Sequence, residues 1–318
     1  MRCLSTATDS IAKSARGALG VISILFLFAA VLCAEPPHLS GVWKADLQKS
    51  KLGGGPPPTS YIVIIEQKTA VINEHAKVKV EAPEFIETTG TTSQRGEHRA
   101  LLTAFDYEKP VVRPYEGIPT RLTGSSSGNT FTIQGETSGT TDHWKRTYEL
   151  SPDGNTLTMT IDGTNEGHPM SSSVVLNKAA EADAAALRAP EKIASVQFKN
   201  VKVEALKNLP ASDFINQMHY FSWSLGKQCT FCHVEHKFDA DDKDEKKTAR
   251  KMVDMAVAIN EHNFESHPEV RCFTCHEGHP HPLSRPLFAD EIAAAQAAAQ
   301  KEHEEHEQNR PAPPPPGK

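Results

Sequence analysis

At 318 residues, with 38% hydrophobic and 23% charged residues, the chain has enough apolar material for about two ordinary domains. Its formal charge of −6 is thinly spread, and no block of lysine and arginine alternates with aromatic residues. Composition therefore argues against a nucleic-acid partner.

The first 34 residues are typical of an export signal. Arg2, Lys13 and Arg16 precede an apolar run, Val21 to Ala34, that is short for a membrane span. Cleavage after Ala34 would discard two of the 6 cysteines, whereas an uncleaved segment would anchor the chain in a membrane. We therefore expect a periplasmic or otherwise extracytoplasmic protein with no membrane span beyond this segment.

Residues 36–177 are predicted to form an antiparallel all-β domain, either a barrel or a sandwich. Short alternating runs separated by turn residues predict strands at 61–66, 77–81, 130–134, 144–150 and 156–162. Residues 151–155, Ser-Pro-Asp-Gly-Asn, have the composition of a hairpin turn between the last two strands.

The opening of this domain, Leu39-Ser40-Gly41-Val42-Trp43-Lys44, loosely resembles the start of lipocalin-like barrels, in which a tryptophan can plug one end. Its histidines are scattered singly among polar residues, so no catalytic cluster is apparent. A ligand-binding barrel and a docking or spacer domain are both compatible with the sequence.

The chain changes character after the β domain. Residues 178–194 are rich in alanine and glutamate and contain a proline, which favours a partly helical, flexible linker. Residues 195–288 form the second predicted domain, which is mainly α-helical and holds the 4 remaining cysteines and 8 of the 15 histidines. Residues 289–318 begin as an alanine-rich helix and end in a proline run, so we expect an exposed tail.

Two Cys-x-x-Cys-His motifs dominate the second domain. One comprises Cys229, Cys232 and His233, and the other comprises Cys272, Cys275 and His276. At this spacing two thiols reach the two vinyl groups of one haem, and the histidine can bind its iron. Chance predicts only about 0.005 such motifs in a chain of this composition. The motifs therefore predict two covalently bound c-type haems, with iron ligands His233 and His276.

The same cysteines could instead bind a zinc ion or form disulfides. A four-cysteine zinc site would need both pairs, but 39 residues separate Cys232 from Cys272, more than the usual spacing of about 15 to 20. A disulfide suits an exported chain. Neither alternative explains why a histidine follows each pair.

A helix with methionines on its apolar face is predicted before each motif. The first follows Pro210 and ends at Gly226, with apolar residues at helical spacing: Phe214, Met218, Phe221 and Leu225. The second spans 247–260 and carries Met252, Met255, Ala256 and Ile259. The residues alone leave open whether these methionines pack or bind iron. Histidines that could compete as ligands are His219, His236, His262 and His267.

The order and spacing of residues 201–287 resemble the cytochrome c subunit family of photosynthetic reaction centres. The resemblance rests on Met218 to His233, on Ala249-Arg250-Lys251-Met252 continuing to Asn260, and on the second motif with its following Glu277-Gly278 and Pro282-Leu283. It implies that Met218 and Met252 are the distal ligands of the first and second haem, with Met255 as the fallback for Met252. Such His/Met ligation raises the reduction potential.

Members of that family carry four haems in two tandem pairs, whereas this chain has one pair behind a β domain, so photosynthesis does not follow from the resemblance. The leading hypothesis is an extracytoplasmic electron carrier, not an enzyme, that exchanges single electrons with redox partner proteins. A peroxidase-like dihaem enzyme would need one open iron, and a sensor would need the β domain to bind a ligand that alters the haems.

Overall fold

The computed structural model describes residues 37–294 except 54–56, 75–77, 94–95 and 166, together with residues 297 and 301. The predicted signal segment and most of the predicted tail lie outside the described residues, although residues 289–294 are helical as expected. In the described part of the chain, no helix combines the length and apolar character needed to span a membrane.

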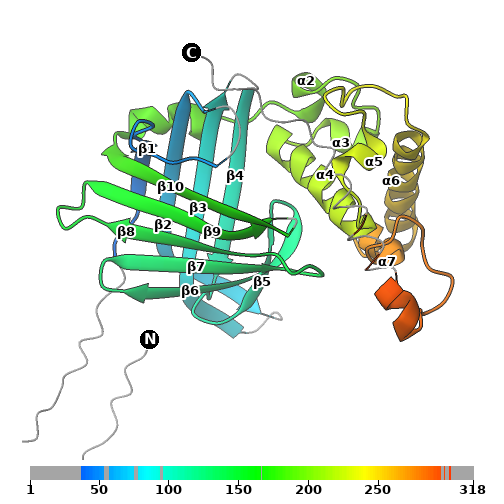
Figure 1. The fold of residues 1–318 in the computed structure, drawn as a ribbon, viewed down its shortest axis with the longest axis horizontal. Helices are drawn as coiled ribbons and strands as arrows, with labels where there is room; N and C mark the ends of the chain where they lie inside the picture. The colour runs from blue at the N-terminus through cyan, green and yellow to red at the C-terminus, as the bar shows by residue number, and fades with distance from the viewer. Residues whose placement is uncertain are drawn as a thin grey trace, which may run out of the picture. The chain divides into compact units, whose positions relative to one another are not determined.

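The first part of the described chain is one antiparallel sheet of ten strands (Figure 1). The strands are β1 (Gly41–Ala45), β2 (Ser60–Glu74), β3 (Val78–Ser93), β4 (Gly96–Phe105), β5 (Val111–Tyr115), β6 (Ile118–Ser127), β7 (Thr130–Thr137), β8 (His143–Leu150), β9 (Thr156–Asn165) and β10 (His168–Ala179). All five predicted strands fall within observed ones, apart from residue 77, which is outside the described residues. The predicted turn at 151–155 joins β8 to β9, where the Gly154 N–H donates to the Ser151 carbonyl at 2.9 Å.

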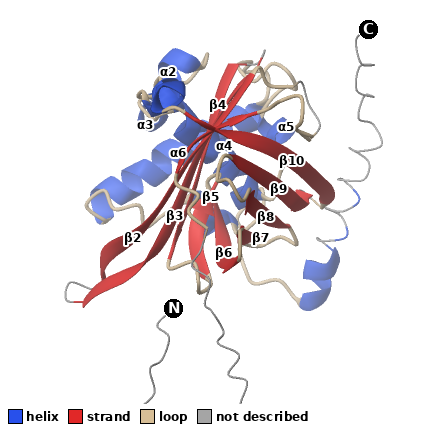
Figure 2. Cartoon of the chain, turned by 90° about the vertical axis from the view of Figure 1, so that its left-hand side faces the viewer, coloured by secondary structure: helices blue, strands red, loops and turns tan. Residues whose placement is uncertain are grey.

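The sheet is a nearly closed barrel, which decides between the two predicted β folds. Strands β1 to β4 pair in sequence order, as do β5 to β10, and β1 also pairs with β10. The edge strands β4 and β5 approach each other without a hydrogen-bonded ladder between them in the described residues. The longest hairpin, β2 with β3, forms an extended two-stranded ribbon (Figure 2).

Alternating inward residues of these strands form the barrel core. The burial pattern of β8, for example, turns Trp144, Arg146 and Tyr148 inward. Arg146 forms a buried ion pair with Glu87, which also accepts the Tyr148 hydroxyl. Trp43 is buried in the same core, and its indole N–H donates to the Leu39 carbonyl at 2.8 Å.

The second part of the chain is helical. Its elements are η1 (Glu181–Ala184), α1 (Ala185–Arg188), α2 (Ala194–Gln197), α3 (Glu204–Lys207), α4 (Ala211–Leu225), α5 (Cys229–Cys232), α6 (Asp244–Asn263) and α7 (Cys272–His276). The long helices α4 and α6 match the two predicted in front of the motifs. Helix α4 starts after Pro210 and ends at Gly226, as its sequence signals predicted.

Residues 178–194 pack against the outside of the barrel, although their composition predicts a flexible linker. Ala184 is fully buried in a cluster with Val42 and Ile64 of the sheet. The Arg99 guanidinium donates to the carbonyls of Leu187 and Ala189 at 3.0 and 2.8 Å. Small alanines allow this close approach, and the arginine caps the last carbonyls of the short helical turn.

Candidate functional site

The first Cys-x-x-Cys-His motif forms a single helical turn followed by extended backbone. Helix α5 begins at Cys229 and ends at Cys232, and His233 follows in an extended conformation. The His233 Nδ1 lies 2.8 Å from the Phe238 carbonyl oxygen. Because a carbonyl can only accept, Nδ1 carries the proton and Nε2 keeps a free lone pair. The ring is thus oriented as a ligand with Nε2 available for a metal.

A cavity of about 630 Å³ lies beside this motif and is lined by Cys229, Cys232 and His233. This volume falls within the range of about 300–1,000 Å³ that is usual for small-molecule sites. All four residues of the predicted apolar stripe on α4 line it: Phe214, Met218, Phe221 and Leu225. His219 and His236, two of the competing ligands, line the cavity as well.

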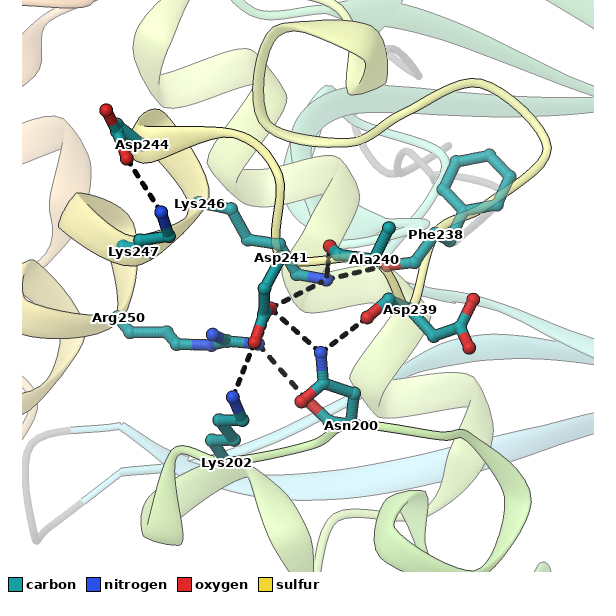
Figure 3. A network of polar contacts seen from close by, with 10 residues as sticks. All are labelled: Asn200, Lys202, Phe238, Asp239, Ala240, Asp241, Asp244, Lys246, Lys247 and Arg250. Carbon is teal, nitrogen blue, oxygen red and sulfur yellow. Dashed lines mark hydrogen bonds and ion pairs between the residues drawn. The ribbon is translucent and has the colours of Figure 1, made fainter.

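A network of polar contacts is centred on Asp241 (Figure 3), and its members Asn200, Lys202 and Arg250 also line the cavity. The Asp241 carboxylate accepts from Arg250 of α6 and from the Asn200 side chain, both at 2.8 Å, and also from Lys202. Hydrogen bonds from Arg250 and Lys202 hold the pKa of the Asp241 carboxyl well below its usual range. The network therefore ties the segment before α3 to α6.

Burial sets the protonation of the motif side chains. It lowers the pKa of His233, which favours the neutral imidazole that a metal requires. It raises the pKa of the Cys232 thiol, and likewise that of Cys272 in the second motif. A thiol with a raised pKa is a poor nucleophile for disulfide exchange.

The second motif repeats the arrangement of the first. Helix α7 begins at Cys272 and ends at His276. The His276 Nδ1 lies 2.9 Å from the His279 carbonyl oxygen, so Nε2 is again left free. The Asn260 side chain bridges α6 to the segment before the motif, donating to the Val270 carbonyl at 2.8 Å and accepting from its N–H at 2.9 Å.

Apolar side chains around the second motif are exposed rather than enclosed. Met252 and Met255 of α6 are 40% and 47% exposed, and Phe273 inside the motif is 37% exposed. Large apolar side chains gathered on a surface indicate a binding area. Both methionine side chains are thus accessible on α6.

The two motifs are joined through the end of α4. The Gly278 N–H donates to the Ser224 carbonyl at 2.9 Å, and the Trp223 ring stacks on Phe273 with centroids 4.4 Å apart. Gly226 adopts a left-handed conformation with φ 59°, and a Cβ there would lie 2.2 Å from the Gly278 oxygen. The segments on which the family resemblance rested therefore contact one another.

The barrel contacts this same helix. The Trp223 indole N–H donates to the Ser138 carbonyl at 2.6 Å. Gly117, in the turn between β5 and β6, has φ +83°, and a Cβ there would lie 2.1 Å from the Asn216 oxygen. No sequence motif marks a backbone oxygen or the partner of a lone side chain, so these contacts, Asn260 and the Phe238 carbonyl could not be predicted.

The described residues fit a haem better than a zinc ion or a disulfide. All four motif cysteines are free thiols, and the described residues hold no group of three or more His, Cys, Asp or Glu side chains that could bind a metal ion. In contrast, each motif offers two thiols and one oriented imidazole. At the first motif, these donors adjoin a mainly apolar cavity. Lysine and arginine side chains also line it, and their charge would complement the carboxylate groups of a haem.

Comparison with known proteins also points to a haem protein. The family model described as "Photosynthetic reaction centre cytochrome C subunit" matches residues 148–314, just over half of the chain. The chain belongs to this family. Membership confirms the resemblance seen in residues 201–287, and a cytochrome c family implies covalently bound haem c.

Two curated relatives match a part of the chain. The photosynthetic reaction center cytochrome c subunit of Rubrivivax gelatinosus is 36% identical over 90 residues, covering 27% of this chain and 24% of the relative. That of Thermochromatium tepidum is 34% identical over 94 residues, covering 28% of this chain and 22% of the relative. The chain thus spans about a quarter of the length of the curated relatives it matches.

Among solved structures, the chain is similar to secretory abundant heat soluble protein 4 from Ramazzottius varieornatus. The TM-score is 0.25 at 10% identity, and the match covers 45% of this chain and 95% of that protein.

Proposed function

We propose that this protein is an extracytoplasmic dihaem cytochrome that carries single electrons. Each Cys-x-x-Cys pair would hold one haem through two thioether bonds. His233 and His276 would bind the two irons on the proximal side, and Met218 and Met252 would bind them on the distal side. A haem held in this way supplies one-electron iron chemistry.

The observation that carries the proposal is the shared geometry of the two histidines. Each donates Nδ1–H to a backbone carbonyl a few residues further along the chain, at 2.8 Å for His233 and 2.9 Å for His276. This bond selects the tautomer with a free Nε2 and stops the ring from rotating. Two motifs far apart in sequence thus each present an imidazole in a fixed orientation with a free Nε2.

The methionine assignment rests on position. Met218 lies on the face of α4 that lines the cavity, beside Phe214, Phe221 and Leu225. On α6, the residues Lys246, Ala249, Arg250 and Val253 line that same cavity, so Met252 belongs to a different face of the helix. A methionine on that face is available to the second motif, to which Asn260 ties α6. A thioether in the sixth position favours electron transfer over binding of a substrate.

A carrier of single electrons requires redox partner proteins, which we therefore assign to this cytochrome. We place it in the periplasm or a comparable compartment, because both c-type haem attachment and the predicted export signal point to that location. The relatives' assembly with a reaction centre is not carried over, because this chain covers only about a quarter of each. The barrel contacts α4 through Ser138, so we propose that it braces the dihaem part.

An optical spectrum with and without carbon monoxide tests the proposal. The protein, matured where haem attachment is supported, should show the weak red band of sulfur ligation when oxidised. Reduced, it should bind carbon monoxide only slowly or in small amount, because both sixth positions are filled. A high-spin haem, or one that takes up the gas at once, would show an open iron and favour a dihaem enzyme instead.

A further inference from the structure

The carbonyl that orients His233 has a second donor. The Phe238 oxygen accepts from His233 Nδ1 at 2.8 Å. It also accepts from the Lys246 ammonium at 2.8 Å (Figure 3). A carbonyl oxygen has two lone pairs and can accept both bonds at once. Lys246, in the first turn of α6, is thus linked to the proximal histidine through a single oxygen atom.

Lys246 is held firmly and away from water. The residue is 8% exposed, and its ammonium also donates to the Ala240 carbonyl at 2.7 Å. Its third neighbour is the Asp241 carboxylate at 3.6 Å. All three neighbours are acceptors, which matches the three donors of a charged ammonium. Asp241 is shared with Arg250 and Lys202, so it offsets the lysine charge only in part.

The second motif differs at this point. The His279 carbonyl accepts the His276 ring N–H at 2.9 Å, and no lysine or arginine of the described chain donates to it. Both proximal histidines therefore donate Nδ1–H to a backbone carbonyl. They differ because only the Phe238 carbonyl also accepts a bond from a lysine. This difference gives an internal comparison within one chain.

A buried positive charge next to a proximal ligand changes the reduction potential of the iron in one direction only. It disfavours the oxidised iron, which carries the additional positive charge, and the effect is stronger where water is excluded. The lysine also draws electron density from the Phe238 oxygen, which weakens its pull on the His233 proton and makes the imidazole a poorer donor to iron. Both effects raise the reduction potential.

We propose that Lys246 is a positioning residue that raises the reduction potential of the Cys229–His233 haem through the Phe238 carbonyl. The inference rests on the proposed function, because it requires His233 to be an iron ligand. It assigns to the first site a tuning device that the second site does not share.

The test is a spectroelectrochemical titration of Lys246→Met and Lys246→Gln in the full chain with both haems attached. Both variants remove the charge, and the glutamine keeps a hydrogen-bond donor. We expect one midpoint potential to fall so that the ratio of oxidised to reduced haem changes about tenfold, or about 59 mV for one electron. The other potential should stay in place. Unchanged potentials in both variants would overturn the inference.

Lys247→Met is the matched control. Lys247 is the neighbouring lysine on α6, its side chain is half exposed, and it pairs with Asp244 at 2.8 Å (Figure 3). Its removal changes the net charge by the same amount, yet both potentials should remain unchanged. An equal fall in this variant would show that overall charge, rather than the shared carbonyl, is responsible.

Asp241→Asn provides a second test that does not depend on the stability of the Lys246 variants. It removes the negative charge 3.6 Å from the lysine, so the same potential should rise. A fall, or no change, would contradict the inference. Failure of the proposed function is distinguishable, because the unaltered protein would then lack two low-spin haems before any residue was changed.

Discussion

The two motifs have the same Cys-x-x-Cys-His pattern and differ in their surroundings. At the first, Cys232 and His233 adjoin a cavity of about 630 Å³ formed by α4, α6 and the segment before α3. At the second, Phe273 and Cys275 are exposed, and the apolar side chains nearby face outward. The first site thus has a cavity beside it, although Cys229 is exposed there as Cys275 is at the second. The second site lies on a surface held by α4 and Asn260.

This difference teaches which property each level of structure controls. In the proposed arrangement, the motif decides where a haem is attached, and the carbonyls of Phe238 and His279 decide which histidine nitrogen faces its iron. Burial and nearby charge decide the potential. We therefore expect the enclosed Cys229–His233 haem to have the higher potential of the two and the exposed one the lower.

The largest expected effect is the loss of one attachment site. Cys229→Ala with Cys232→Ala should leave one haem per chain, and Cys272→Ala with Cys275→Ala should do the same. Haem absorbance after denaturation would fall by about half in each, because thioether bonds alone survive unfolding.

The two double variants should differ in stability. Loss of the first haem leaves the apolar face of α4 unfilled, so its melting temperature should fall further than that of the second. Equal melting temperatures would contradict the contrast between an enclosed and an open site.

The next largest effect concerns the sixth ligands. Met218→Ala should open the first iron, so that one of the two haems loses its sulfur band and binds carbon monoxide. Met252→Ala should do the same at the second haem. Met255→Ala is the control on the same helix and should leave both spectra unchanged; if Met255→Ala alone opens a haem, the assignment of Met252 is wrong.

A smaller effect is expected at the junction between the motifs. Gly226→Ala should destabilise the protein by about 3 kcal/mol, because a left-handed alanine is strained and its Cβ meets the Gly278 oxygen at 2.2 Å. Gly128→Ala, in an exposed turn with φ +54° and nothing within 4 Å of the new Cβ, should cost about 1 kcal/mol. Thermal unfolding monitored by circular dichroism would measure both, and equal losses would argue against close packing between Gly226 and the second motif.

The smallest effect is a dependence on pH at the first site. Hydrogen bonds from Arg250 and Lys202 lower the pKa of Asp241 in the folded protein, so its contribution to stability is present above the unfolded value of about 3.9. It is lost as pH falls through the lower folded value. Asp241→Asn should therefore be less stable than the unaltered protein at pH 7, and urea unfolding should show the gap closing below about pH 4. A gap independent of pH would mean that the carboxylate charge is not involved.

Much of this architecture follows from local sequence patterns. Alternation in Trp144–Leu150 predicts a strand, and the spacing of Phe214, Met218, Phe221 and Leu225 predicts the face of α4 that lines the cavity. The Cys-x-x-Cys-His spacing predicts the attachment sites because that chemistry is confined to five residues.

Features that depend on long-range contacts could not be predicted in the same way. The choice of barrel over sandwich requires the pairing of β1 with β10, which are more than a hundred residues apart. The packing of Ala184 against the sheet could not be predicted either, since composition does not reveal which surface a segment meets. Lys246 resembles any helical lysine until its acceptor, a backbone oxygen, is known.

The most direct test of the account is the number and position of haems in the unaltered protein. The chain should be matured where haem attachment is supported, then denatured, digested and analysed by mass spectrometry. We predict one haem on the peptide containing Cys229 and Cys232 and one on the peptide containing Cys272 and Cys275. A single haem, or cysteines joined to each other instead, would contradict the dihaem assignment on which the rest depends.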